Sequence, residues 1–198
     1  MKNLKINALA ILAILAISSC SKDEPAKQPA PVVEEELFTT ITAVFTPIGT
    51  GNIVTLRSRD VDGDGPIRPD ITISGPFAQN TTYNGEVTAL DETKSPAKDM
   101  TEEIQELGAE HQLFYVKTGN LPNFTYTPIA ESADNFDANG KPIGLKTKFV
   151  TTSAATGSLK IILKHEGNKS AAGVVNGDFT NATGSTDFEV TFIGINIQ

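Results

Sequence analysis

The sequence predicts an all-β protein, mainly an antiparallel β-sandwich that is immunoglobulin-like or similar, with one short helix inserted near residues 99–108. Short segments in which apolar and polar residues alternate with a period of two indicate half-buried strands. Clusters of Gly, Pro, Asn and Asp separate these segments, which is typical of a sandwich or barrel with frequent turns. Residues 37–198 have a length suited to a single domain with its own core.

The N-terminal residues 1–19 are predicted to be a lipoprotein signal peptide. A basic start is followed by residues 8–17, which carry no polar side chain. This run is shorter than the roughly 20 apolar residues that cross a bilayer, so it indicates a secretory signal. The next residues, Ile17-Ser18-Ser19-Cys20, resemble the lipobox of bacterial lipoproteins, whose cysteine is acylated after cleavage just before it. An ordinary secretory signal followed by an unpaired cysteine is the alternative.

Residues 20–36 are predicted to be the lipidated Cys20 and a flexible, acidic, Pro-rich tether. Such a segment cannot bury enough apolar surface to fold. Residues 21–24, Ser-Lys-Asp-Glu, are similar to the export signal of some surface lipoproteins of Gram-negative bacteria. We therefore expect a protein that is held at the outer membrane by its lipid and exposed at the cell surface, with the periplasmic face as the alternative.

Strands and turns are predicted to fill most of residues 37–198. In the last strand, Phe188 and Val190 alternate with Asp187 and Glu189, so we expect the two acids on the face opposite the aromatic residue. The predicted strands are residues 38–47, 52–60, 70–75, 81–90, 111–118, 123–130, 144–152, 157–166 and 186–197.

One helix is expected between the fourth and fifth of these strands. Asp99 is a suitable N-cap and Glu102 follows three residues later, as in a capping box. Gly108 is a plausible end of the helix. The apolar stripe consists of Met100, Ile104 and Leu107, so this helix is expected to pack over a sheet edge or an end of the sandwich.

The composition and the motifs argue against two classes of function. A net charge of −8 disfavours binding to nucleic acid. The chain contains no G-x-S-x-G elbow, no P-loop and no G-x-G-x-x-G motif. We therefore predict that the protein is not an enzyme.

The segment RDVDGDGP is similar to the beginning of a calcium loop. Asp60, Asp62 and Asp64 alternate, as in the D-x-D-x-D-G start of an EF-hand. Ile71 occupies the position of the twelfth, acidic ligand, and Asp70 comes one residue early, so a true EF-hand is excluded. A looser calcium site formed by these four aspartates and a plain polar turn remain as alternatives. A second acidic loop, residues 133–144, contains Asn-Gly and predicts a hairpin turn.

Two His-Glu pairs are candidate ligands of a transition metal. Glu110 precedes His111, and His165 precedes Glu166, each pair at a predicted strand end. Imidazole and carboxylate are suitable ligands if the fold brings the two pairs together. The spacing matches no established zinc motif, so an ordinary hydrogen-bonded role is the alternative.

Three stretches resemble a family of small bacterial outer-membrane lipoproteins that is commonly labelled "type 1 periplasmic binding fold superfamily protein". The label names a fold of two α/β lobes, whereas the length and strand pattern here predict a β-sandwich. The resemblance implies an accessory of an outer-membrane uptake system, with a TonB-dependent receptor as the partner. The stretches are VTLRSRDVDGDGP, the segment from NTTYNGEVTAL to HQLFY, and the segment from GSLKIILKHEG to FEVTF.

These observations predict a lipid-anchored binding protein of the cell envelope that captures a metal ion or a small ligand. Calcium at the aspartate loop or a transition metal at the histidines would be the cofactor. The alternative is a structural or adhesive surface lipoprotein without a small-molecule ligand.

Overall fold

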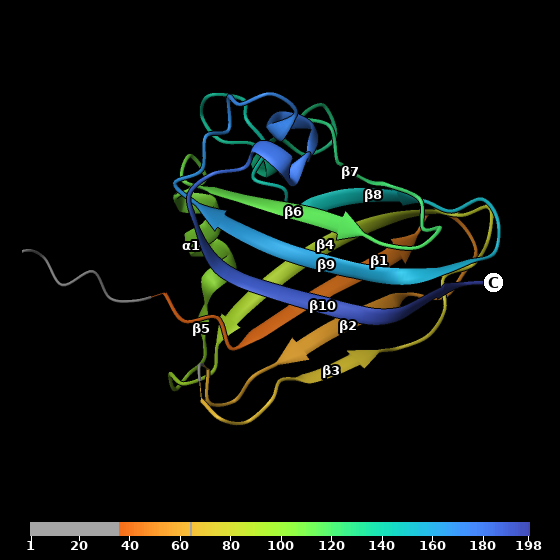
Figure 1. Cartoon of the computed structure of the whole chain (residues 1–198), viewed down its shortest axis with the longest axis horizontal. Helices are drawn as coiled ribbons and strands as arrows, with labels where there is room; N and C mark the ends of the chain where they lie inside the picture. The colour runs from red at the N-terminus through yellow and green to blue at the C-terminus, as the bar shows by residue number, and fades with distance from the viewer. Residues whose placement is uncertain (1–35, 64) are drawn as a thin grey trace, which may run out of the picture. The chain divides into compact units, whose positions relative to one another are not determined.

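Two antiparallel β-sheets face each other in the part of the chain that the structure, a computed structural model, describes: residues 36–63 and 65–198. This arrangement confirms the predicted all-β sandwich (Figure 1). The predicted signal peptide, Cys20 and most of the tether lie outside the described residues, as does Asp64. Glu36, which the sequence assigns to the tether, belongs to the same compact unit as the sandwich.

The larger sheet has the strand order β3-β2-β1-β4-β8-β7, and β5 pairs with β4. Apolar residues alternate with polar ones along β2, where Val54 and Leu56 are buried as the sequence predicts. The strands are β1 (Thr40–Pro47), β2 (Val54–Arg59), β3 (Asp70–Ile73), β4 (Thr82–Asp91), β5 (Lys98–Asp99), β7 (Phe124–Tyr126) and β8 (Lys146–Val150).

The smaller sheet consists of β6 (His111–Lys117), β9 (Ala155–His165) and β10 (Ser185–Ile197), in the order β10-β9-β6. Figure 1 shows these three strands lying across the larger sheet. The two-residue strand β5 and three short 3₁₀ helices carry no clear sequence pattern and were not predicted. The 3₁₀ helices are η1 (Ala133–Asn135), η2 (Val174–Asn176) and η3 (Phe179–Asn181).

The predicted helix is α1 (Met100–Glu106), which connects the two sheets. The carboxylate of Asp99 accepts a hydrogen bond from the backbone N–H of Thr101, which confirms the predicted N-cap. Met100 and Ile104 are buried, whereas Leu107 is partly exposed because it follows the last helical residue. Among the described residues, no helix is both long and apolar enough to cross a membrane.

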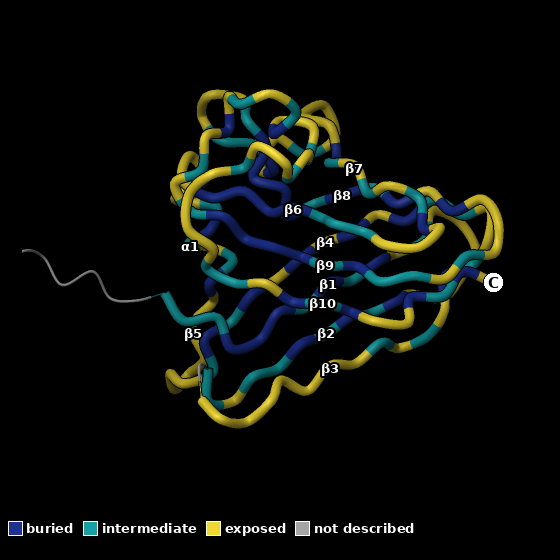
Figure 2. Tube along the Cα trace, in the orientation of Figure 1, coloured by how far each residue is buried: buried dark blue, intermediate teal, exposed yellow. Residues whose placement is uncertain are grey.

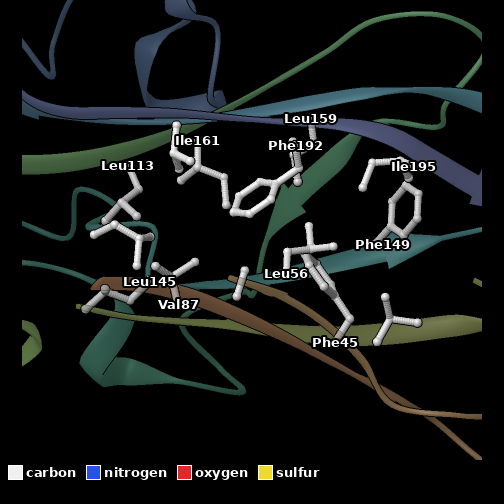
Figure 3. Packing of buried hydrophobic residues seen from close by; sticks show 14 of the residues in the cluster. Phe45, Leu56, Val87, Leu113, Leu145, Phe149, Leu159, Ile161, Phe192 and Ile195 are labelled. Atoms are coloured by element: carbon white, nitrogen blue, oxygen red, sulfur yellow. The ribbon is translucent and has the colours of Figure 1, made fainter. Parts of the chain in front are cut away.

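The hydrophobic core fills the space between the sheets (Figures 2 and 3). Phe149 stacks on Phe124 with ring centroids 4.2 Å apart and also packs against Phe45 and Phe77. Figure 3 shows side chains from both sheets pointing toward one another: Phe45, Leu56, Val87 and Phe149 from one sheet, and Leu113, Leu159, Ile161, Phe192 and Ile195 from the other.

The outer face of the smaller sheet is also covered. Ile162 of β9 is buried with Phe114 and Val174 in a second apolar cluster. Alternation along β9 places Ile162 on the same face as Lys160 and Lys164, so the sequence alone did not indicate that this face is covered. The segment 166–184, which contains η2 and η3, supplies this cover (Figure 1).

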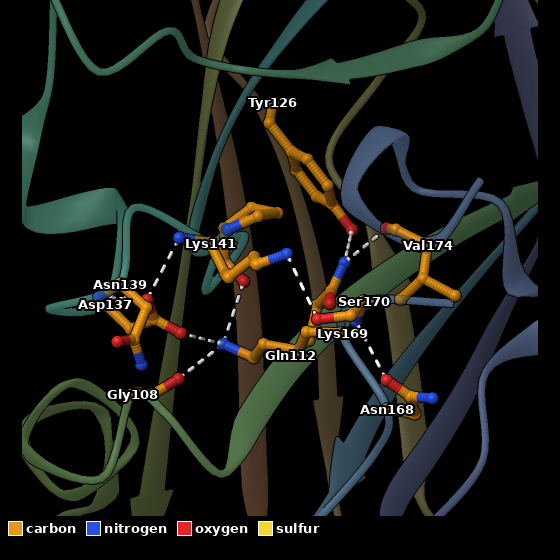
Figure 4. A network of polar contacts seen from close by, with 11 residues as sticks. Gly108, Gln112, Tyr126, Asp137, Asn139, Lys141, Asn168, Lys169, Ser170 and Val174 are labelled. Carbon is orange, nitrogen blue, oxygen red and sulfur yellow. Dashed lines mark hydrogen bonds and ion pairs between the residues drawn. The ribbon is translucent and has the colours of Figure 1, made fainter. Parts of the chain in front are cut away.

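A buried lysine anchors the covering segment (Figure 4). The Lys169 ammonium donates to the carbonyl of Gly108, to the carbonyl of Pro142 at 3.0 Å and to the Asp137 carboxylate at 3.2 Å. Lys169 therefore connects the covering segment to the end of α1 and to the loop before β8. This end of the sandwich is where the two histidine-bearing strands begin and end.

Candidate metal centre

The two histidines lie side by side at one end of the smaller sheet. His111 is the first residue of β6 and His165 is the last residue of β9, and the antiparallel register places them directly opposite each other. Their ring centroids are 4.7 Å apart. The His111 side chain is fully buried, whereas that of His165 is 25% exposed. The structure thus brings together the two strand ends whose proximity the sequence left open.

A β-bulge in β10 adds an aspartate to the histidine pair. Thr186 is opposite Lys164 and Phe188 is opposite Leu163, so Asp187 is the extra residue of the bulge. Regular alternation places Asp187 on the face opposite Phe188, and that expectation is wrong here. A bulge lets two successive residues face one partner residue. The carboxylate of Asp187 consequently lies against the histidines and is only 10% exposed.

A glutamate from the beginning of the described chain completes the group. The Glu36 carboxylate lies 3.4 Å from Nε2 of His111. Its position is fixed by its neighbours: Phe38 packs on Phe188 with ring centroids 5.3 Å apart, and Thr39 donates from its backbone N–H to the Leu90 carbonyl. We call Glu36, His111, His165 and Asp187 the inner cluster.

Three contacts within the inner cluster are longer than direct hydrogen bonds and close to the separation of two ligands on one ion. Nε2 of His111 is 3.4 Å from Glu36 Oε2 and 3.5 Å from Asp187 Oδ2, and Nδ1 of His165 is 3.5 Å from Asp187 Oδ1. Hydrogen bonds are shorter than this. Ligand atoms at 2.0–2.2 Å from a tetrahedral zinc ion are roughly 3.3–3.6 Å apart. All four side chains offer ligand atoms within 4.8 Å of one another.

His111 is the least satisfied member of the inner cluster. Both of its ring nitrogens are buried, and neither has a hydrogen-bond partner among the described residues. One carboxylate oxygen of Glu36 and one of Asp187 are also buried without a hydrogen-bond partner among the described residues. Buried polar atoms are normally paired, because leaving one unpaired costs about 1–3 kcal/mol. One nitrogen of the His111 ring, Nε2, lies near both unpaired carboxylate oxygens, so a single ion could satisfy these three atoms.

The charges of the inner cluster also fit a divalent cation. Burial raises the pKa of Asp187, and the two histidines oppose that rise only in part. Burial acts to lower the pKa of His165, but the negative charges of Asp187, Glu110 and Glu36 outweigh burial and raise it. As ligands of an ion, two carboxylates and two neutral imidazoles would carry a charge of −2, which Zn²⁺ would neutralise.

A second group of ligands lies beside the inner cluster and shares His165. Nε2 of His165 contacts the Glu110 carboxylate at 3.3 Å, while Nδ1 of the same ring faces Asp187. Glu110, His165 and Glu166 offer ligand atoms within 4.8 Å of one another, and both glutamates are exposed. We call these three residues the outer triad. The four ligands predicted from sequence are therefore gathered at one end of the sheet.

The predicted calcium loop shows mainly turn contacts in its described part. Asp62 accepts a hydrogen bond from the backbone N–H of Ile67, and a Cβ on Gly65 would lie only 2.0 Å from the Asp62 carboxylate. Asp70 is opposite Arg59 in the pairing of β2 with β3. Asp60 donates from its backbone to the Thr39 carbonyl. Because Asp64 is not described, calcium binding at this loop stays a prediction.

The second acidic loop is a turn, as its Asn-Gly sequence predicts. Asp137 accepts hydrogen bonds from the backbone N–H groups of Asn139 and Lys141 and pairs with Lys169. Asp134 pairs with Lys146 at the surface. The acids of this loop therefore stabilise the turn.

A polar groove of about 290 Å³ lies on the outer face of the larger sheet. Its lining includes Thr46, Asn84, Glu86, Glu131, Ser132 and Lys146. Two of these charges are already paired, Glu131 with Lys148 and Lys146 with Asp134. The groove thus offers hydrogen-bonding groups but, unlike the inner cluster, no buried unpaired ligand atoms.

Comparison of the chain with protein-family models, with curated proteins and with solved structures finds no match. The geometry of the sandwich and its two ligand groups is therefore the basis for a functional proposal.

Proposed function

We propose that the protein is a non-enzymatic, lipid-anchored protein of the outer membrane that captures a divalent transition-metal ion in the inner cluster. The observation that carries this proposal is the convergence of Glu36, His165 and Asp187 on the buried ring of His111, whose nitrogens have no hydrogen-bond partner among the described residues. Imidazole with carboxylate is typical of zinc and related ions, whereas calcium takes six to eight oxygen ligands. The lipobox-like sequence and the outer-membrane lipoprotein resemblance support the location and a TonB-dependent receptor as the partner.

Thermal unfolding with added ions tests this proposal. The purified protein in mild detergent is stripped with EDTA and then melted alone and with zinc, copper or calcium. An ion that binds only the folded state at a hundred times its dissociation constant stabilises by about 2.7 kcal/mol. We expect zinc or copper to raise the melting temperature clearly, and calcium to have at most a small effect.

Two substitutions in β10 provide a matched pair for this experiment. Asp187→Asn removes an inner carboxylate, whereas Glu189→Gln removes an outward carboxylate that pairs with Lys160. We expect Asp187→Asn to lose most of the ion-dependent rise and Glu189→Gln to keep it. A melting temperature of the unmodified protein that no transition metal changes would contradict the proposal.

The alternative is a structural or adhesive surface lipoprotein without a ligand. It is favoured by Asp62 and Asp137, whose carboxylates hold turns together. Under this alternative the inner cluster would only fasten Glu36 to the sandwich. The melting experiment separates the two, because a structural role gives no ion-dependent shift.

A further inference from the structure

We infer that the outer triad, Glu110, His165 and Glu166, is a landing site through which a metal ion enters and leaves the inner cluster. This inference rests on the proposed metal capture and concerns its route. His165 belongs to both the outer triad and the inner cluster. One ring nitrogen faces Glu110 and the other faces Asp187, so the imidazole connects an outer and an inner set of carboxylates.

Solvent exposure falls stepwise from the outer triad inward. The side chain of Glu110 is 47% exposed, that of His165 is 25% exposed, that of Asp187 is 10% exposed and that of His111 is fully buried. A hydrated ion cannot reach His111 without first losing water to more accessible ligands. His165 is the most exposed member of the inner cluster, and the two exposed glutamates lie beside it. The approach through the outer triad therefore offers ligands at every step.

The backbone holds the two outer glutamates in place. The N–H of Glu166 donates to the carbonyl of Glu110 at 2.8 Å, which ties the end of β9 to the beginning of β6. Glu166 has a φ of 52°, a left-handed conformation that is uncommon for a residue other than glycine. A carboxylate oxygen of Glu166 lies within 4.8 Å of ligand atoms of His165 and Glu110.

The two groups should differ in affinity. The outer triad has three ligands, two of them in contact with water, whereas the inner cluster has four ligands and a buried histidine. Ions at exposed carboxylates are held weakly because water competes and salt screens the charges. The outer triad would thus bind zinc briefly, and the inner cluster would hold it.

Zinc association and dissociation kinetics of the Glu110→Gln/Glu166→Gln double variant test this inference. A landing site is used in both directions, so its removal should slow association and dissociation by a similar factor, on the order of tenfold. The equilibrium affinity, measured by titration with zinc alone, should change by much less. Stopped-flow mixing with a zinc-sensitive dye gives the association rate, and a chelator chase gives the dissociation rate.

A second double variant controls for long-range attraction. Glu106→Gln/Glu131→Gln removes the same amount of charge from outside both metal groups. Loss of general electrostatic attraction lowers the association rate and leaves dissociation almost unchanged. If the outer variant behaves like this control, or keeps both rates, the landing site is overturned while metal capture stands. If the unmodified protein binds no zinc, metal capture itself fails.

Discussion

Asp187 is the residue whose role depends most on a local irregularity of the backbone. Its carboxylate reaches the inner cluster because the bulge in β10 turns it toward the histidines. Without an ion, this position is unfavourable for a charged aspartate, because burial raises its pKa. A site that is prepared for a cation is expected to be strained when the cation is absent.

Asp187→Asn is therefore expected to leave the ion-free protein as stable as the unmodified one, or more stable, at pH 7. A carboxyl whose pKa is raised by folding contributes stability below its unfolded pKa, about 3.9, and loses that contribution as the pH rises through the folded value. Asparagine resembles the protonated form at every pH. The difference in melting temperature between the two proteins should thus vanish near pH 3 and grow toward pH 7.

Thermal melts in EDTA across this pH range provide the measurement, and Glu189→Gln is again the control. A large loss of stability in Asp187→Asn at pH 7 would mean that the charged carboxylate stabilises the fold through the histidines. In that case the inner cluster would be a structural ion network, and an unfilled metal site would be the wrong description.

At the scale of elements, most strands were predictable from sequence, and the alternation with a period of two is clearest in β1, β2, β4 and β8. The helix was predictable from the Asp99 cap and the apolar stripe that follows it. The sequence did not predict that the segment 166–184 covers the smaller sheet, because it is rich in Gly, Asn and Ala and has no periodicity. Its attachment depends on Lys169, whose partners are distant in sequence.

The candidate site was only half predictable, for a related reason. His111 and His165 stood out as histidines at strand ends, with Glu110 and Glu166 beside them. Asp187 could not be predicted as a member of the inner cluster, because the alternation of residues in β10 does not indicate the bulge. Glu36 could not be predicted because it ends a run of three glutamates in a segment without periodicity, and its place depends on the contacts of Phe38 and Thr39 with distant residues.

Lys169→Met is expected to destabilise the protein by about 3–5 kcal/mol. The substitution removes the partner of Asp137, whose carboxylate is almost completely buried, and an unpaired buried charge is costly. Lys141→Met is a matched control, because the Lys141 ammonium makes an exposed hydrogen bond to Ser170; a change within about 0.5 kcal/mol is expected there. Unfolding in urea gives both values. Equal losses for the two variants would show that Lys169 is not the anchor of the covering segment.

At the scale of the whole molecule, the proposed function depends on an anchor that lies outside the described residues. The core of the sandwich is closed between its two sheets. One acyl chain holds a protein at a bilayer only marginally, whereas two or more hold it firmly. Under the proposed function, acylation of Cys20 would therefore determine whether the proposed metal centre is kept at the membrane.

Cys20→Ala is expected to abolish incorporation of labelled palmitate and to release the protein from the membrane fraction. The fold should be unaffected, and the variant should show the same zinc-dependent rise in melting temperature as the native protein. Palmitate labelling that persists in the variant would exclude acylation at Cys20. Protease treatment of intact cells then distinguishes the surface from the periplasmic face.

The inner cluster draws its ligands from both ends of the described chain, from Glu36 to Asp187. An ion held there would be a reversible cross-link that closes a loop of nearly the whole sandwich. Because the ion binds only the folded state, it leaves the denatured chain unrestricted, and its stabilisation would grow with the concentration of the free ion. A chain with a single cysteine cannot form an internal disulfide. The ion would take over that function in an oxidising compartment, and a chelator rather than a reductant would undo it.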